Sequence, residues 1–148
     1  MSYVALADLV VNVAFAHPAD APYMSVCTIG THDMNPVRAW WEEDRAVTQK
    51  FYNEQMGWWG EAPQEMSPEI AEFIVNQHMY SPAMWVILPL QDWFAIDGDI
   101  RLADQHAERI NLPSNPEHFW NYRMHLTLEE LLKKDAFNAH VKSLTQVR

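Results

Sequence analysis

Several residue types that would point to common protein classes are scarce in this chain. Its 148 residues contain one cysteine, Cys27, which excludes an internal disulfide framework and a cysteine-based zinc site. Lys and Arg number 10 against 20 Asp and Glu, and the resulting net charge of −10 disfavours binding to nucleic acids or to an anionic membrane surface. No apolar run approaches the roughly 20 residues of a membrane span. These features favour a reducing, cytoplasmic setting.

What the sequence does contain is enough apolar material for one folded domain. Hydrophobic residues make up 49% of the chain and seven residues are Trp. Because the indole N–H needs a partner when it is buried, so many Trp residues indicate either a large core or flat aromatic surfaces for a ligand such as a sugar ring.

Residues 1–21 are expected to form a separate lead segment, helical or irregular. The stretch 3–16 is apolar and ends in Ala14-Phe15-Ala16, as a signal-peptidase site would. However, Asp8 interrupts the run and no Lys or Arg precedes Arg38, whereas a signal peptide has a basic start and an uncharged middle. Secretion is therefore the less favoured alternative.

The rest of the chain predicts a helix-rich α/β fold. Residues 23–29 and 84–90 are continuous apolar runs, which is typical of strands buried on both faces of a parallel sheet. Helical spacing of apolar residues follows over 37–52 and 67–80, and 98–116 forms a long polar loop. The order predicts a parallel crossover between two strands. Two strands do not make a stable parallel sheet, so a further part of the fold is expected elsewhere.

Local signals predict where these helices begin. Asn35-Pro36 and Ser67-Pro68 combine a capping side chain with Pro at the first helical position. Thr127 and Glu130 form a capping box for a last helix, with a break near Asp135 and an apolar side that includes Leu128 and Leu132. Asn115-Pro116 predicts a short helical turn reaching Trp120.

Polar residues follow both predicted strands. His32-Asp33 comes after the first and Gln91-Asp92 after the second. Reactive groups of α/β folds lie at the carboxyl ends of strands, so these side chains are candidates for chemistry on one side of the sheet. The structural alternative for Asp33 is a helix cap, and for His32 a hydrogen-bonded residue within a turn.

Several separate motifs follow one another along the chain. They are Thr31-His32-Asp33-Met34, Arg38-Ala39-Trp40-Trp41-Glu42-Glu43-Asp44, Ser81-Pro82-Ala83-Met84, Pro89-Leu90-Gln91-Asp92, Glu108-Arg109-Ile110-Asn111-Leu112-Pro113, Asn115-Pro116 and 120–123. In this order they resemble the motifs of the 4-α-glucanotransferases of glycoside hydrolase family 77, and the resemblance extends roughly from Pro22 to the C-terminus.

The resemblance implies a (β/α)8 barrel that transfers α-1,4-glucan segments between maltodextrins with retention and without a cofactor. Residues 22–148 would be its C-terminal part, the last two strands and the surrounding helices. Such enzymes use a nucleophile and an acid/base about 5–5.5 Å apart. Asp33 matches a third carboxylate that stabilises the transition state, and His32 matches a neighbouring residue that binds the same sugar.

Other residues are weaker candidates for substrate binding. Asn111 matches a substrate-side polar residue of the family, and Gln91 and Asp92 are expected at the floor of the cleft. Trp120, close to the long loop, is the best candidate for stacking on a sugar, although a place in the core is an equal alternative.

The carboxylates that would form and break bonds are missing from the pattern. No Glu precedes Glu42, and neither Asp8 nor Asp20 follows a convincing strand. Glu42, Glu43 and Asp44 fall on the helix after Asp33, where they are expected to face solvent or helix partners. A complete barrel needs about 250 residues. The chain is therefore expected to be inactive alone, with the glucan and the remainder of the barrel as its partners.

Three rival interpretations remain. A metal site is disfavoured, because the other histidines show no ligand spacing around His32-Asp33. Trp58-Trp59 could be a sugar platform, but packing of a loop is favoured. Finally, the chain could be a non-catalytic glucan-binding or scaffold domain that forms a homo-oligomer through exposed strand edges.

Overall fold

The fold contains one small parallel sheet within the part of the chain that the structure describes. The computed structural model describes residues 3–4, 17–120 and 122–148, and within them the sheet has three strands in the order β1-β2-β3. The strands are β1 (Tyr3–Val4), β2 (Val26–Cys27) and β3 (Trp85–Val86). Both pairings are parallel, with Val26 level with Trp85 and Cys27 level with Val86.

The first strand was not expected. Residues 3–4 pair with β2, so the prediction of a helical or irregular lead segment is wrong at these two positions. Residues 5–16, including Ala14-Phe15-Ala16, lie outside the described part of the chain. A 3-10 turn, η1 (Pro18–Asp20), follows, and the His17 side chain accepts a hydrogen bond from the Ala19 N–H at its start.

The two predicted strands exist and are neighbours, but they are shorter than the apolar runs. Pairing extends slightly beyond the strand bounds, since the Trp85 N–H donates to the Ser25 carbonyl at 3.3 Å and the Ile87 N–H to the Cys27 carbonyl at 3.0 Å. The second run ends early because Pro89 leads directly into a helix, α5 (Leu90–Phe94).

Helical segments make the predicted crossover from β2 to β3. They are α2 (Val37–Glu43), α3 (Arg45–Lys50), a π-helical turn η2 (Phe51–Gln55) and α4 (Pro68–Met79). The spacing over 37–52 had predicted one helix, but the chain breaks at Asp44. Its backbone is extended there, and its side chain accepts hydrogen bonds from the Ala46 and Val47 N–H groups as the cap of α3.

Of the two other predicted helix starts, one is confirmed and one is wrong. Ser67 caps α4 as expected, through its hydroxyl and the Ile70 N–H. Asn35 does not cap α2: Pro36 occupies the cap position and provides no side-chain hydrogen bond. The start of α2 is satisfied from elsewhere in the chain, as described below.

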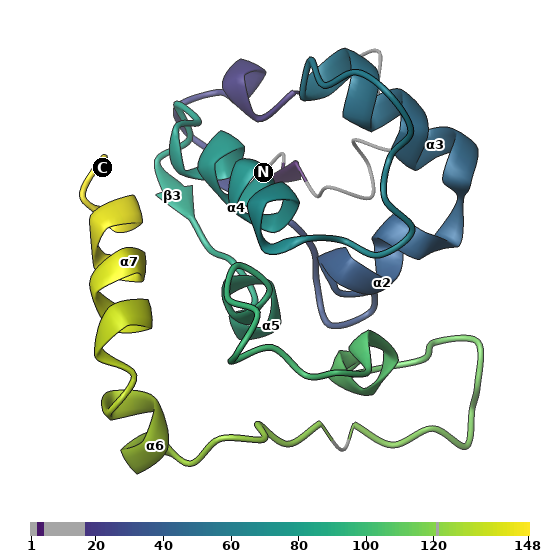
Figure 1. Ribbon diagram of the computed structural model, residues 1–148, viewed down its shortest axis with the longest axis vertical. Helices are drawn as coiled ribbons and strands as arrows, with labels where there is room; N and C mark the ends of the chain where they lie inside the picture. The colour runs from purple at the N-terminus through teal and green to yellow at the C-terminus, as the bar shows by residue number, and fades with distance from the viewer. Residues whose placement is uncertain (1–2, 5–16, 121) are drawn as a thin grey trace.

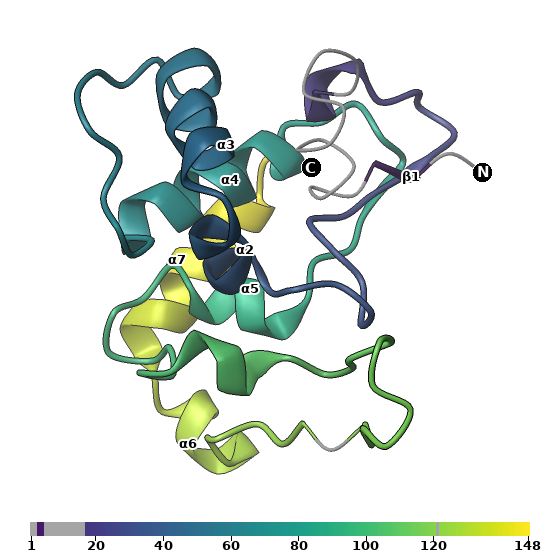
Figure 2. The same ribbon diagram turned by 90° about the vertical axis from the view of Figure 1, so that its right-hand side faces the viewer.

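The core lies between the sheet and these helices. In Figure 2 most of the helices gather to the left of the strands. The main buried cluster draws on α2, η2, α4, α5 and α7 (Asp135–Thr145), and Val86 of β3 packs against it, while Cys27 of β2 belongs to a smaller separate cluster. Its largest fully buried members include Trp41, Phe94, Ile70 and Ile74. Trp41 satisfies its ring N–H by donating to the Pro63 carbonyl at 3.0 Å.

The C-terminal third wraps around the lower edge of the molecule (Figure 1). It contains a 3-10 turn, η3 (Gln105–Glu108), then α6 (Leu128–Leu132) and α7. The capping box of Thr127 and Glu130 is confirmed, and so is the break before Asp135. Residues 115–120 form turns and no helix, and Leu128 and Leu132 are exposed, so these two expectations are wrong.

Candidate functional site

The candidate site is built on the loop that follows β2. Here the Met34 N–H donates to the Thr31 carbonyl at 3.1 Å, which closes a turn around His32 and Asp33. Both side chains are about half exposed, at 47% and 50%. Asp33 does not cap α2, so the structural alternative considered for it does not hold.

Three other groups meet around Asp33. The Asn111 amide donates to Asp33 Oδ1 at 2.6 Å, from a loop 78 residues further along the chain. His32 Nε2 lies 3.3 Å from Asp33 Oδ2. The ring of Trp120, itself 61% exposed, lies over His32 with the ring centroids 4.3 Å apart. We refer to His32, Asp33, Asn111 and Trp120 as the Asp33 cluster.

Gln91 and Asp92 lie beneath this cluster and are not at an exposed strand end. They belong to the first turn of α5 and are only 4% and 1% exposed. Both line a small space of about 30 Å³ that also touches His32. Their part in a cleft floor stays a prediction, and their side chains are buried and not presented to solvent.

The Asp92 side chain caps the start of α2, although Asp92 itself belongs to α5. Its Oδ1 accepts a buried hydrogen bond from the Val37 N–H at 2.9 Å. The first N–H groups of a helix lack intrahelical partners, so this carboxylate performs the role that the sequence had assigned to Asn35. The loop after β2 and the start of α5 are thereby joined.

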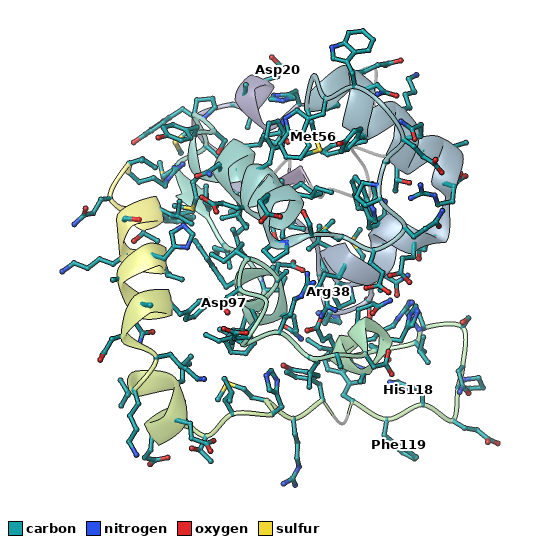
Figure 3. The ribbon with its side chains drawn as sticks, in the orientation of Figure 1. Asp20, Arg38, Met56, Asp97, His118 and Phe119 are labelled. Carbon is teal, nitrogen blue, oxygen red and sulfur yellow. The ribbon has the colours of Figure 1, made fainter. Side chains whose placement is uncertain are left out.

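A buried ion pair joins α2 to η3. Arg38 Nη1 lies 3.2 Å from Glu108 Oε1, with side-chain exposures of 8% and 1%, and it also donates to the Leu102 carbonyl at 2.7 Å. Gln91 adds a hydrogen bond to the Glu108 carbonyl. Figure 3 shows Arg38 in the interior, whereas Phe119 lies at the outer loop. Sequence reasoning had given Arg38 and Glu108 no role, because nothing local shows that these charges are buried together.

Arg109 joins the two loops that carry Asp33 and Asn111. Its guanidinium donates to the Asn35 side chain and, through Nε, to the Asn111 carbonyl at 2.8 Å. Asn35 in turn donates to Glu43. These contacts fix the backbone of Asn111 next to the turn that holds Asp33, so the 2.6 Å contact between the two side chains has rigid supports on both sides.

Burial shifts the buried carboxylates toward their neutral forms. Loss of hydration raises the pKa of Asp92 to about 7, opposed by the Val37 N–H and reinforced by the charge of Glu108. Burial also raises the pKa of Glu108, although Arg38 opposes this. The charge of Arg38 thus acts on Glu108, whereas the Val37 N–H is the group that opposes the shift at Asp92.

The arrangement can bind a polyhydroxylated ligand at the Asp33 cluster. It offers a carboxylate, an imidazole, an amide and an exposed indole face within one small region.

The acidic residues at the end of α2 make contacts elsewhere, as expected: Asp44 caps α3, and Glu42 lies 3.9 Å from His106. Among the described residues, no three His, Cys, Asp or Glu side chains converge as metal ligands do. No helix there has the length and apolar character needed to cross a membrane.

A family model and several known proteins match most of the chain. The model of glycoside hydrolase family 77, described as 4-alpha-glucanotransferase, matches residues 5–128. The match begins within the lead segment, which the resemblance had left outside.

Two curated relatives and one solved structure are informative. The chain is 41% identical over 133 residues to 4-alpha-glucanotransferase DPE2 of Oryza sativa subsp. japonica, covering 90% of this chain and 14% of the relative. It is 28% identical over 127 residues to a 4-alpha-glucanotransferase of Chlamydia caviae, covering 82% and 22%. Amylomaltase from Streptococcus agalactiae, solved in complex with acarbose, superposes with a TM-score of 0.63 at 20% identity, over 88% of this chain and 23% of that one.

Proposed function

Because this chain belongs to glycoside hydrolase family 77, the 4-alpha-glucanotransferases, we propose that it supplies one part of an active site that transfers α-1,4-glucan segments between maltodextrins. The observation that carries the proposal is the 2.6 Å contact of Asn111 with Asp33 beside His32, since it joins residues of two separate family motifs. The chain spans 14% and 22% of the length of the two curated relatives, so the activity belongs to a larger assembly.

Each member of the Asp33 cluster has a proposed role. Glycosyl transfer passes through a positively charged, oxocarbenium-like transition state. The Asp33 carboxylate stabilises that charge and accepts sugar hydroxyls, while Asn111 holds its Oδ1 in a fixed orientation. His32 hydrogen-bonds the same sugar, and Trp120 offers its exposed face to a neighbouring ring. Buried Gln91 and Asp92 support the cluster and do not touch the glucan.

The chain is proposed to be the C-terminal part of a (β/α)8 barrel, with residues 22–148 forming its last two strands and surrounding helices. The alternation over residues 85–88 supports this. Trp85 and Ile87 are exposed, whereas Val86 and Leu88 pack against the core cluster. In a barrel, the two faces of a strand contact the helices and the filled interior respectively. The remainder of the barrel is thus the proposed partner of this face, and it would bring the nucleophile and the acid/base.

A reconstitution experiment tests this function. The chain alone is expected to show no disproportionation of maltotriose. Co-expression with the preceding part of the rice relative should restore it. Asp33→Asn in the restored enzyme should lower kcat by about 100-fold or more with little change in KM, because the carboxylate acts on charge that develops in the transition state.

The matched control is Asp20→Asn, an exposed carboxylate on η1, which should leave turnover unchanged. Full turnover by the chain alone, or unchanged turnover with Asp33→Asn, would refute the proposed division of roles. The cytoplasmic setting expected from the single cysteine stays a prediction.

A second candidate function is a scaffold that self-associates or binds glucan without turnover. The exposed apolar residues of β3 favour it, because such residues promote association. If co-expression gives a stable complex with no turnover while the chain alone forms defined oligomers, this second function would replace the first.

A further inference from the structure

The adjacent residues Trp58 and Trp59 lie in opposite environments. Trp58 packs edge-to-face against Tyr52, with ring centroids 5.5 Å apart, and against Phe73 at 6.0 Å. This fits the predicted packing of the loop. Trp59 does not fit it: the residue is 88% exposed, the highest value among the exposed large apolar residues of the described chain. The packing prediction is therefore wrong for Trp59.

Two glycines set the path of the loop that presents Trp59. Gly57 has a φ of 68° and Gly60 a φ of 101°, both in the region that disfavours other residues. They turn the backbone on either side of the Trp58-Trp59 pair. The pair can thus send one ring into the core and the other into solvent.

Side-chain amides from the preceding helices fix this loop. Asn53 donates to the Trp58 carbonyl at 2.7 Å, and Gln49 donates to the Gly60 carbonyl at 2.9 Å. Gln49 also accepts from the Ala62 N–H at 2.8 Å. A loop held in this way shows its exposed indole in one place, so little ordering is needed when a ligand binds.

We propose that Trp59 is a second glucan-binding platform, separate from the Asp33 cluster. A flat indole face suits the apolar C–H face of a hexopyranose ring, and the exposed ring N–H can donate to a sugar hydroxyl. Trp59 is the only exposed large apolar residue within residues 25–79, all of which the structure describes, so its own segment forms no apolar patch around it. A protein interface needs a patch of several hundred Å². The net charge of −10 favours a neutral ligand over an anionic one.

The platform lies away from the Asp33 cluster. Helix α3 leads the chain away from α2, and the loop after η2 lies at the far end of that segment, whereas the Asp33 turn precedes α2 (Figure 1). A single stacking contact is weak on its own. On a long glucan held at two places, the second contact becomes intramolecular and raises the apparent affinity. Trp59 would therefore favour long glucans over short ones, an inference that rests on the proposed function for its ligand class.

Affinity electrophoresis in native gels containing amylopectin tests the inference on the chain itself. Wild type should be retarded relative to a gel without amylopectin. Trp59→Ala should raise the apparent dissociation constant about tenfold or more, and Trp59→Phe should retain part of the retardation because a ring remains. Binding of maltotriose, followed by NMR shifts at His32, should be the same in all three proteins.

Tyr80→Ala is the matched control, since Tyr80 is an aromatic residue that is also exposed, at 68%, but lies at the end of α4. It should keep the wild-type retardation. Equal retardation of wild type and Trp59→Ala overturns the proposal, and so does an equal loss in Tyr80→Ala. Failure of the proposed function would look different: Asp33→Asn would leave reconstituted turnover unchanged, whatever Trp59→Ala does to amylopectin binding.

Discussion

Asp33 and Asp92 follow the two apolar runs of the chain in similar sequence settings, yet they end in opposite environments. Asp33 has a half-exposed side chain held by Asn111, whereas Asp92 is 1% exposed and caps a helix to which it does not belong. Motif order identified both residues, but their burial depends on segments more than 50 positions away. An accessible carboxylate at Asp33 was therefore predictable, whereas the buried cap formed by Asp92 was not, and the catalytic role of Asp33 stays a prediction.

Asp92 makes stability depend on pH in an unusual direction. Its pKa of about 7 in the folded chain exceeds the ordinary value of 3.8, so between these values the folded state binds a proton that the unfolded state does not. The contribution of this group to stability is largest below pH 4 and falls as pH rises toward 7. Asp92→Asn, which can still accept from Val37, should therefore gain roughly 2–3 kcal/mol relative to wild type on going from pH 5 to pH 8.

Urea unfolding of both proteins at the two pH values measures this gain. Groups that titrate equally in both proteins cancel in the comparison. An identical pH dependence for wild type and variant would show that Asp92 does not titrate in this range.

At the scale of elements, the long loop after α5 is held in place by its charges. Glu108 on η3 pairs with Arg38 on α2, and Arg109 binds both Asn35 and the Asn111 carbonyl. This loop brings Asn111 and Trp120 to the Asp33 cluster. The ion pair thus holds the loop that carries two residues of the Asp33 cluster, although neither residue of the pair belongs to the cluster.

Replacing one residue of this ion pair should lower the free energy of unfolding more than replacing both residues. Arg38→Met leaves Glu108 buried without its cation, so we expect a loss of about 3 kcal/mol or more in the free energy of unfolding. The double variant Arg38→Met with Glu108→Leu should recover most of that loss, because no unpaired charge remains. Denaturant melts of the single and double variants measure both values. If the losses simply add, the two charges are not coupled.

Element boundaries were predictable where the signal is local. Ser67 caps α4 and Thr127 pairs with Glu130, and each interaction spans three residues. The break at Asp44 also has a local signal, because its side chain accepts hydrogen bonds from the Ala46 and Val47 N–H groups. The apolar spacing over 37–52 continues across this cap, so one continuous helix was predicted there.

At the scale of the whole molecule, the segment 85–88, which contains β3, has one covered and one uncovered face. Val86 and Leu88 pack against the core cluster, while Trp85 and Ile87 are 59% and 61% exposed. Sequence reasoning anticipated that a two-stranded unit would be incomplete. It missed β1, because a strand of two residues inside an apolar run has no period of its own.

This uncovered face should make the isolated chain associate. Sedimentation velocity of wild type is expected to show concentration-dependent oligomers. The double variant Trp85→Thr with Ile87→Thr should shift the chain toward monomer, since Thr keeps strand propensity while it removes exposed apolar area. Leu128→Thr with Leu132→Thr, on α6, is the control and should leave the distribution unchanged. A monomeric wild type would contradict this expectation.

The cap that Asp92 supplies to α2 also constrains the order in which the chain folds. Its partner Val37 lies 55 residues earlier, so the first turn of α2 cannot be completed by local sequence. The chain must first close this large loop to bring α5 to α2, and closing a long loop costs chain entropy before any contact is gained. We therefore expect the first turn of α2 to form late in folding, together with the turn that holds Asp33.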